Sequence, residues 1–137
     1  MKKNIYVVGA VIINDGKVLC AQRGETKTLA RMWEFPGGKI ENGETNEQAL
    51  TREIKEEMHC EVVIGEHITT TTYEYEFGTV HLATYFAKIK TGTPLLTEHI
   101  QIKWLHPLEM DELQWAPADI PAVKIISETN IATLTFN

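Results

Sequence analysis

Hydrophobic residues recur along most of the chain with a period of two or in short apolar runs, which is typical of β-strands. The runs Ile5–Ile13 and Val18–Gln22 flank the turn sequence Asn14-Asp15-Gly16-Lys17, so they predict two strands joined by a tight turn. Further strands are predicted over Val62–Ile64, Ile68–Phe77, Val80–Ile89 and Ile100–Leu105. Within Ile68–Phe77, aromatic residues alternate with glutamates, which indicates a strand with one exposed face.

The clearest helix is predicted over Asn46–His59, where apolar residues recur every four positions and form a stripe. The stripe consists of Leu50, Ile54 and Met58. Thr45, followed three residues later by Gln48, matches a capping box at the start of this helix. Two later elements are predicted as well, a short helical turn over Pro107–Leu113 and a last helix from near Ala118–Pro121 to near Glu128.

The order of these elements predicts a layered α/β domain with a mixed sheet, since strands surround a central helix and a second helix comes late. The 137 residues suit a single domain over 1–137, and the chain has no repeat, low-complexity tract or linker. Hydrophobic residues make up 43% and charged residues 23%, as in soluble globular proteins. No apolar run is long enough to cross a membrane, and none resembles a signal peptide, so a cytoplasmic protein is expected.

The net charge of −6 argues against nucleic acid as a partner, because an acidic protein repels phosphate backbones at long range. A small polyanion could still bind if a metal ion or a few cations neutralised it locally. Cys20 and Cys60 lie far apart and outside any C-x-x-C pair, so they predict neither a disulfide framework nor a zinc site. Two reduced, partly buried thiols are expected instead.

Three glutamates share one face of the predicted helix, because Glu53, Glu56 and Glu57 stand at i, i+3 and i+4. Like charges so placed repel by roughly 0.2–0.5 kcal/mol per pair. A divalent cation such as Mg²⁺, which takes oxygen ligands, would reverse that repulsion, whereas a merely solvated face is the alternative. The flanks favour metal binding, since Gly37-Gly38 allows a close backbone approach and Arg52 could pair with a carboxylate and hold it.

Many residues around this helix match one spacing, G-x5-E-x7-R-E-U-x-E-E-x-G-U, which is the Nudix box. The matching positions are Gly38, Glu44, Arg52, Glu53, Ile54, Glu56, Glu57 and Cys60. The chain therefore resembles the Nudix hydrolase family over nearly its whole length. It departs at His59, where the box has a glycine that ends the helix in a left-handed conformation. This departure puts the helix end in doubt more than the metal ligands.

The resemblance implies a Nudix fold, an α/β/α sandwich around a mixed sheet. It also implies attack by water on a phosphorus inside a diphosphate linkage, helped by Mg²⁺ or Mn²⁺, which neutralises phosphate charge and makes water more acidic. The implied metal ligands are the Gly37 carbonyl, Glu53, Glu56 and Glu57, and Glu53 or Glu56 is a candidate general base. Glu98 is a further candidate, because MutT-like proteins often carry a glutamate in the corresponding loop; a solvated loop glutamate is the alternative.

Several features favour a nucleoside triphosphate substrate. Trp33–Glu41 resembles the MutT-type triphosphate branch of the family. Arg23 matches a position that commonly contacts phosphate in that branch, and Lys39 is a similar candidate, although either could be an ordinary surface residue. ADP-ribose hydrolases usually have a proline after the box, and no proline occurs here between Pro36 and Pro94. The dinucleoside-polyphosphate branch usually has a tyrosine near the Tyr75 position, so it is excluded less firmly.

Recognition of the base is predicted outside the box. Trp115–Pro121 resembles the corresponding segment of bacterial MutT-like CTP pyrophosphohydrolases, in which the Asp119 position contacts the base edge. A carboxylate there would accept a hydrogen bond from an exocyclic amine such as cytosine N4; a cap of the last helix is the alternative. Phe35 and Tyr75 are candidate walls against the base, with core packing and an exposed sheet surface as the respective alternatives.

The predicted activity is hydrolysis of a nucleoside triphosphate to a monophosphate and pyrophosphate, with cytidine or damaged nucleotides as substrates, which would clear the nucleotide pool. Oxidised purine triphosphates, nucleoside diphosphate sugars and dinucleotides are alternative substrates. A nucleotide-sensing module without catalysis is the alternative from another class. His59 favours it, while the complete set of box glutamates argues against it. The resemblance leaves a monomer and a homodimer open.

Overall fold

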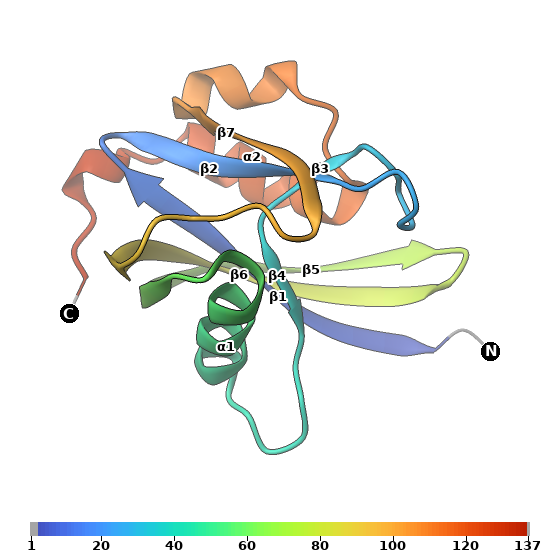
Figure 1. Ribbon diagram of the computed structural model, residues 1–137. Coiled ribbons are helices and arrows are strands. Elements are labelled where there is room, and N and C mark those ends of the chain that lie inside the picture. Colours follow the sequence, from blue (N-terminus) through green and yellow to red (C-terminus); the bar gives the residue numbers. More distant parts are fainter. Residues whose placement is uncertain (1–2, 137) are drawn as a thin grey trace.

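The computed structural model describes residues 3–136, which form a mixed β-sheet with helices on both sides (Figure 1). The strands are β1 (Asn4–Asn14), β2 (Lys17–Arg23), β3 (Trp33–Glu34), β4 (Gly37–Lys39), β5 (Glu61–Tyr75), β6 (Gly78–Thr91) and β7 (His99–Leu105). The α-helices are α1 (Asn46–Met58) and α2 (Ile120–Ser127), and short 3-10 helices span Pro107–Glu112, Pro117–Asp119 and Ile131–Thr133. Within residues 3–136, no helix is long and apolar enough to cross a membrane.

Strand β1 lies at the centre of the sheet, because it pairs with neighbouring strands in both parallel and antiparallel orientation. It runs parallel to β6, with Val7 opposite Leu82, and antiparallel to β2 and β4. Strand β5 extends the sheet beyond β6, while β3 and β7 pair with β2. The parallel β1–β6 pair within otherwise antiparallel ladders confirms the mixed sheet expected from sequence.

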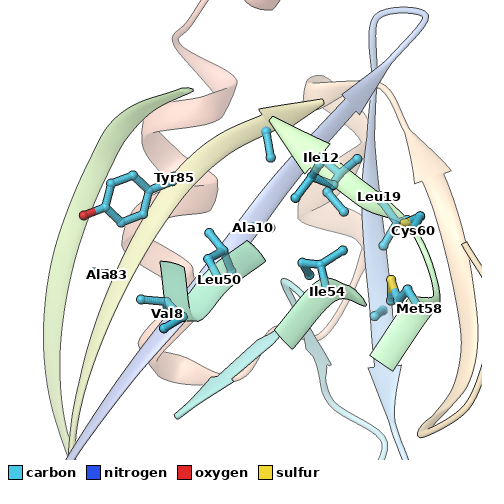
Figure 2. Close-up of a cluster of buried hydrophobic side chains, with 14 residues drawn as sticks. Val8, Ala10, Ile12, Leu19, Leu50, Ile54, Met58, Cys60, Ala83 and Tyr85 are labelled. Atoms are coloured by element: carbon cyan, nitrogen blue, oxygen red, sulfur yellow. The ribbon is translucent and has the colours of Figure 1, made fainter. Parts of the chain in front are cut away.

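Two hydrophobic cores form because alternate residues of β1 point to opposite sides of the sheet. On one side, Val8, Ala10 and Ile12 pack against the apolar stripe of α1, as Figure 2 shows. The stripe residues Leu50, Ile54 and Met58 are fully buried, which confirms the periodicity expected for this helix. On the other side, Val11 belongs to a second core with residues of α2 such as Ala122 and Ile126. The helices therefore cover opposite faces, and the α/β/α sandwich is confirmed.

The β5–β6 hairpin differs from the prediction. Val62–Ile64 and Ile68–Phe77, expected as two strands, belong to the single strand β5, whose register against β6 shifts between Ile64 and His67 and again before Thr69. Such irregularities bend a strand without ending it, so the break in the hydrophobic pattern did not mark a loop. The strand also ends earlier, at Tyr75, because the next two residues form the tight turn.

Both ends of α1 have the expected caps. Thr45 Oγ1 accepts from the Gln48 N–H at 3.1 Å, and Gln48 Oε1 accepts from the Thr45 N–H at 2.9 Å, which completes the capping box. At the other end, His59 takes the left-handed conformation, with φ 57° and ψ 32°. Histidine thus occupies the backbone conformation for which the Nudix box has a glycine, and the helix still ends at the box position.

Replacing His59 with glycine is expected to raise the free energy of unfolding by about 1 kcal/mol, because an L side chain is strained in the left-handed region and glycine is not. Urea unfolding at constant pH measures the change. His59→Ala is the matched control: it removes the ring, keeps the strained Cβ and should give no such gain. Equal stabilisation by both substitutions would mean that the imidazole, not the backbone, is unfavourable.

Candidate active site

A cleft of about 450 Å³ lies between the sheet, the C-terminal part of α1 and the segment before α2. Most of the site residues predicted from sequence line it, namely Arg23, Phe35, Gly37, Lys39, Glu57, Tyr75, Glu98 and Asp119. Arg52, Glu53 and Glu56 are not among the lining residues. The structure therefore brings the predicted substrate contacts together with only part of the box.

Gly37 and Gly38 allow the chain to pass between β1 and α1 at very close range. A Cβ atom added at Gly37 would come within 1.9 Å of the Val8 carbonyl oxygen. One added at Gly38 would come within 2.4 Å of the Glu53 carboxylate. The clash at Gly37 is with backbone atoms, so packing requires a glycine there, whereas a side chain at Gly38 would displace the Glu53 carboxylate. The Glu53 carboxylate therefore lies directly against Gly38.

Arg52 holds the acidic face of α1 in place, as predicted from its position in the box. Its guanidinium donates to both carboxylate oxygens of Glu44, at 2.7 and 2.9 Å, and to Glu53 Oε1 at 2.9 Å. It also contacts Glu56 Oε2 at 3.3 Å and the Lys39 carbonyl at 3.0 Å. The bidentate bond from Arg52 lowers the pKa of Glu44 to about 2. Glu53 and Glu56 are thus directed toward Arg52, and the Glu56 side chain is 62% exposed.

Glu57 is the box carboxylate that faces the cleft. It is largely buried, and its Oε2 atom has no hydrogen-bond partner among the described residues. Burial, followed by the charges of Glu53, Glu34 and Glu98, raises its pKa to about 8, and a backbone hydrogen bond from Gly37 opposes the shift only in part. A buried acceptor without a donor, surrounded by negative charge, is an unfavourable arrangement for a protein alone.

A divalent cation fits this arrangement, because it would give the Glu57 oxygen a partner and neutralise the neighbouring charges. Glu57, Glu98 and the Gly37 carbonyl line the cleft and could hold it, with Glu53 close behind Gly38. Within residues 3–136, no three His, Cys, Asp or Glu side chains form a ready-made ligand cluster. A hard cation that keeps several waters and also binds substrate phosphates does not require one.

Two cleft residues that sequence reasoning did not single out are Glu34 and His99. Glu34 Oε1 accepts from Arg23 Nη1 at 2.8 Å, and Glu34 Oε2 lies 2.9 Å from His99 Nε2. Arg23 is held further by Thr28, whose carbonyl accepts from Nε at 2.6 Å. The predicted phosphate contact is therefore fixed in position at the cleft wall. A signal for each residue was present in the sequence, because Glu34 lies between two large aromatics and His99 lies next to Glu98.

Asp119 does not cap the last helix, so that alternative is wrong. It already has helical dihedrals, φ −87° and ψ −18°, in a 3-10 turn that continues into α2, and its side chain makes no capping bond. Its Oδ1 atom instead accepts from the Phe35 N–H at 3.1 Å. Burial, reinforced by the charge of Glu34, raises the pKa of Asp119 well above its ordinary value. Burial therefore disfavours the charged form of this carboxyl group.

The aromatic candidates are more buried than expected. Phe35 packs in the core, with its ring centroid 4.8 Å from that of Trp115, and is only 3% exposed at the cleft. Tyr75 is not an exposed sheet-surface residue, because its hydroxyl accepts from the Ala118 N–H at 2.9 Å and its side chain is buried. Phe77, which the sequence marked as an aromatic of the alternating strand but not as a substrate contact, stacks on Tyr75 with centroids 5.0 Å apart. At 43% exposure, Phe77 offers more ring surface to the cleft than either.

Outside the cleft, Cys20 and Cys60 are free and buried.

Comparison with known proteins decides the family. The model of the NUDIX domain matches residues 3–124, which cover the sheet, α1 and the cleft. The chain belongs to the Nudix family. A Nudix hydrolase cleaves acid anhydrides, and these enzymes generally use divalent metal ions. The cleft described above is therefore the candidate active site of a Nudix hydrolase.

Several proteins are similar to this Nudix hydrolase over most of their length. It is 39% identical over 122 residues to the CTP pyrophosphohydrolase of Escherichia coli strain K12, covering 89% of this chain and 90% of that protein. It is 32% identical over 131 residues to the 8-oxo-dGTP diphosphatase of Haemophilus influenzae, covering 94% and 96%. Among solved structures, the MutT protein of methicillin-resistant Staphylococcus aureus 252, a Nudix hydrolase, is 55% identical, with a TM-score of 0.77 and coverage of 94% and 100%.

Proposed function

We propose that this Nudix hydrolase converts nucleoside triphosphates to monophosphates and pyrophosphate, and that cytidine nucleotides, CTP and dCTP or modified forms of them, are its preferred substrates. The observation that supports this substrate preference is Asp119, a buried carboxyl group that lines the cleft and is oriented by the Phe35 N–H. An oxygen of this carboxyl group can accept a hydrogen bond from the N4 amine of cytosine. Uracil presents a carbonyl oxygen, itself an acceptor, at the position of that amine.

The phosphates would lie at the other end of the cleft, toward Glu57 and Glu98. A bound Mg²⁺ or Mn²⁺ neutralises phosphate oxygens and makes water more acidic. Glu57, Glu98, Glu53, Glu56 and the Gly37 carbonyl are the proposed ligand set. Arg23 and Lys39 bind phosphate oxygens. Arg52 orients Glu53, and Glu53 or Glu56 takes the proton from the attacking water.

Oxidised purine triphosphates are the second candidate substrates, favoured by relatives that are 31–35% identical and are named as 8-oxo-dGTP diphosphatases. The role of either activity is clearance of unwanted nucleotides from the pool. We further propose a single Nudix hydrolase domain over residues 1–137, acting in the cytoplasm as a monomer or homodimer on small molecules, without nucleic acid. The match over 3–124 and the two cores that share β1 support a single domain.

Specificity constants across a panel of nucleotides test the proposed substrate class. The panel contains CTP, dCTP, UTP, ATP, GTP and 8-oxo-dGTP, with a nucleoside diphosphate sugar and a dinucleoside polyphosphate. CTP and UTP are the matched pair, and kcat/KM for CTP should be larger by about tenfold or more because UTP lacks the amine. Equal values would contradict base selection by Asp119. No turnover of any nucleotide by the metal-loaded protein would favour the sensing module.

Replacing Asp119 with alanine is expected to reduce the ratio of kcat/KM for CTP to that for UTP by about tenfold, because the acceptor for the base amine is lost. Asp119→Asn is the matched control: its amide oxygen keeps an acceptor for the base amine and for the Phe35 N–H. The asparagine variant should keep the CTP preference within about threefold. Equal losses for every base in Asp119→Ala would contradict the assignment and indicate a purely structural role.

A further inference from the structure

The segment between β6 and β7 crosses the C-terminal end of α1 before it reaches the cleft. At Gly92, φ is 93°, and an added Cβ atom would lie 3.0 Å from the His59 carbonyl oxygen and 3.1 Å from Cys60 Cβ. Further along, the Leu95 N–H donates to the Met58 carbonyl at 3.0 Å, and the Thr97 hydroxyl donates to the Glu57 carbonyl. The loop is thus bonded to the last turn of the helix at two consecutive carbonyls.

These bonds have a clear physical cause. The last carbonyl groups of an α-helix have no partner within the helix, so each of them accepts from another donor or from water. The Leu95 bond uses the backbone, which any residue except proline provides. The Thr97 bond uses a side-chain hydroxyl, so it depends on the identity of that residue. A single hydroxyl therefore determines whether the Glu57 carbonyl is bonded to the loop.

Thr97 lies directly before Glu98, and both Glu57 and Glu98 line the cleft. The two glutamates come from elements far apart in sequence, and the Thr97 hydroxyl bonds the residue directly before Glu98 to the Glu57 carbonyl. We infer that Thr97 is a positioning residue, which fixes the Glu98 carboxylate relative to Glu57 through its hydrogen bond to the Glu57 carbonyl. This inference rests on the proposed function, in which Glu57 and Glu98 act on the same substrate phosphates.

A merely structural role would be to complete the end of α1. The two roles differ in whether the effect of removing Thr97 depends on Glu98. If Thr97 acts through Glu98, then its removal matters only while Glu98 is present. If it only stabilises the helix end, its removal has the same effect whether or not Glu98 is present. A double-mutant cycle on kcat separates these cases, because non-additivity reports the interaction between the two residues.

The experiment compares Thr97→Val, Thr97→Ala, Thr97→Ser, Glu98→Gln and Thr97→Val/Glu98→Gln in the full-length protein with Mg²⁺ and CTP. Valine keeps the shape of threonine without the hydroxyl, and serine keeps the hydroxyl. We expect Thr97→Val to lower kcat about tenfold, the rate equivalent of one lost hydrogen bond, with little change in KM. Thr97→Ser should stay within about twofold of wild type, and Thr97→Val should cause no further loss in the Glu98→Gln background.

Amide hydrogen exchange of residues 94–99 in the metal-free protein gives a second readout that does not depend on turnover. Exchange at Leu95 should be faster in Thr97→Val and Thr97→Ala and unchanged in Thr97→Ser. A loss of kcat of the same size in the Glu98→Gln background would overturn the inference, as would wild-type kcat in both hydroxyl-free variants. Thr97→Ala serves for both tests if the valine variant is unfolded by circular dichroism. A wild-type kcat in Glu98→Gln would overturn the inference together with the role of Glu98 in the proposed function.

Discussion

Replacing Glu57 with glutamine is expected to lower kcat by at least ~10²-fold, the lower range for losing a catalytic carboxylate. Glu57 is the box residue with its side chain at the cleft, and its buried Oε2 atom has no partner among the described residues. Glutamine has nearly the same shape but neither the charge that holds a cation nor a second acceptor oxygen. Steady-state kinetics at saturating Mg²⁺ and CTP measures the loss.

The same substitution should stabilise the metal-free protein at alkaline pH. The pKa of Glu57 is about 8 in the folded protein and 4.5 as its ordinary value, so the folded protein binds this proton more tightly than the unfolded chain. The associated stability is present below pH 4.5 and is lost as the pH rises toward 8. Glu57→Gln removes this loss. We therefore expect the stability of the variant relative to wild type, measured as free energy of unfolding, to be greater at pH 9 than at pH 5 by an amount on the order of 2 kcal/mol.

Glu56→Gln is the matched control for these two effects. Glu56 belongs to the same box, so its replacement should also lower kcat by at least ~10²-fold. Its side chain is 62% exposed and bonded to Arg52, so the pH dependence of stability should stay as in wild type. Unchanged rates in both variants would place the chemistry on other residues. Stability of Glu57→Gln that falls between pH 5 and pH 9 like that of wild type would contradict the raised pKa.

Replacing Arg52 with lysine is expected to lower kcat by about 10–100-fold and the free energy of unfolding by about 1–3 kcal/mol. Lysine keeps the charge, but it cannot bond both Glu44 oxygens, Glu53 and the Lys39 carbonyl at once as the guanidinium does. The carboxylate of Glu53 then loses its fixed orientation beside Gly38. Kinetics and urea unfolding of the same preparation measure both quantities.

Arg31→Lys provides the matched control for this change. Arg31 also pairs with a glutamate, Glu25, but both side chains are more than 60% exposed and lie outside the box. An exposed ion pair contributes little, so neither kcat nor stability should change measurably. Wild-type kcat in Arg52→Lys would show that its fork of hydrogen bonds is not needed to orient the acidic face.

The parts of the fold that could be predicted from sequence are those determined by local patterns. The period of the apolar stripe and the Thr45–Gln48 pair defined α1, whereas the histidine at the glycine position of the box left the conformation of the helix end open. The strand β5 was divided wrongly because a bulged strand loses its alternation locally while its ladder with β6 continues. Register shifts are properties of a strand pair, which one strand's sequence does not contain.

The site was predicted in composition but not in geometry. Helical spacing placed Glu53, Glu56 and Glu57 on one face, yet it could not show that Arg52 holds the first two while the third faces the cleft. The direction of each glutamate side chain depends on contacts with residues that only the folded chain brings close. Asp119 and its donor Phe35 lie 84 residues apart, so the sequence could not show that the Asp119 side chain bonds the Phe35 N–H and does not cap α2. Glu34 and His99 escaped notice for the same reason, since their hydrogen bond spans 65 residues.

We propose that this Nudix hydrolase cuts a nucleoside triphosphate between the α- and β-phosphates. Phosphorus-31 nuclear magnetic resonance of one reaction, CTP with Mg²⁺ and the wild-type protein, tests it most directly because every product gives its own resonances. We expect CMP and pyrophosphate in equal amounts, with no CDP. CDP together with inorganic phosphate would contradict it.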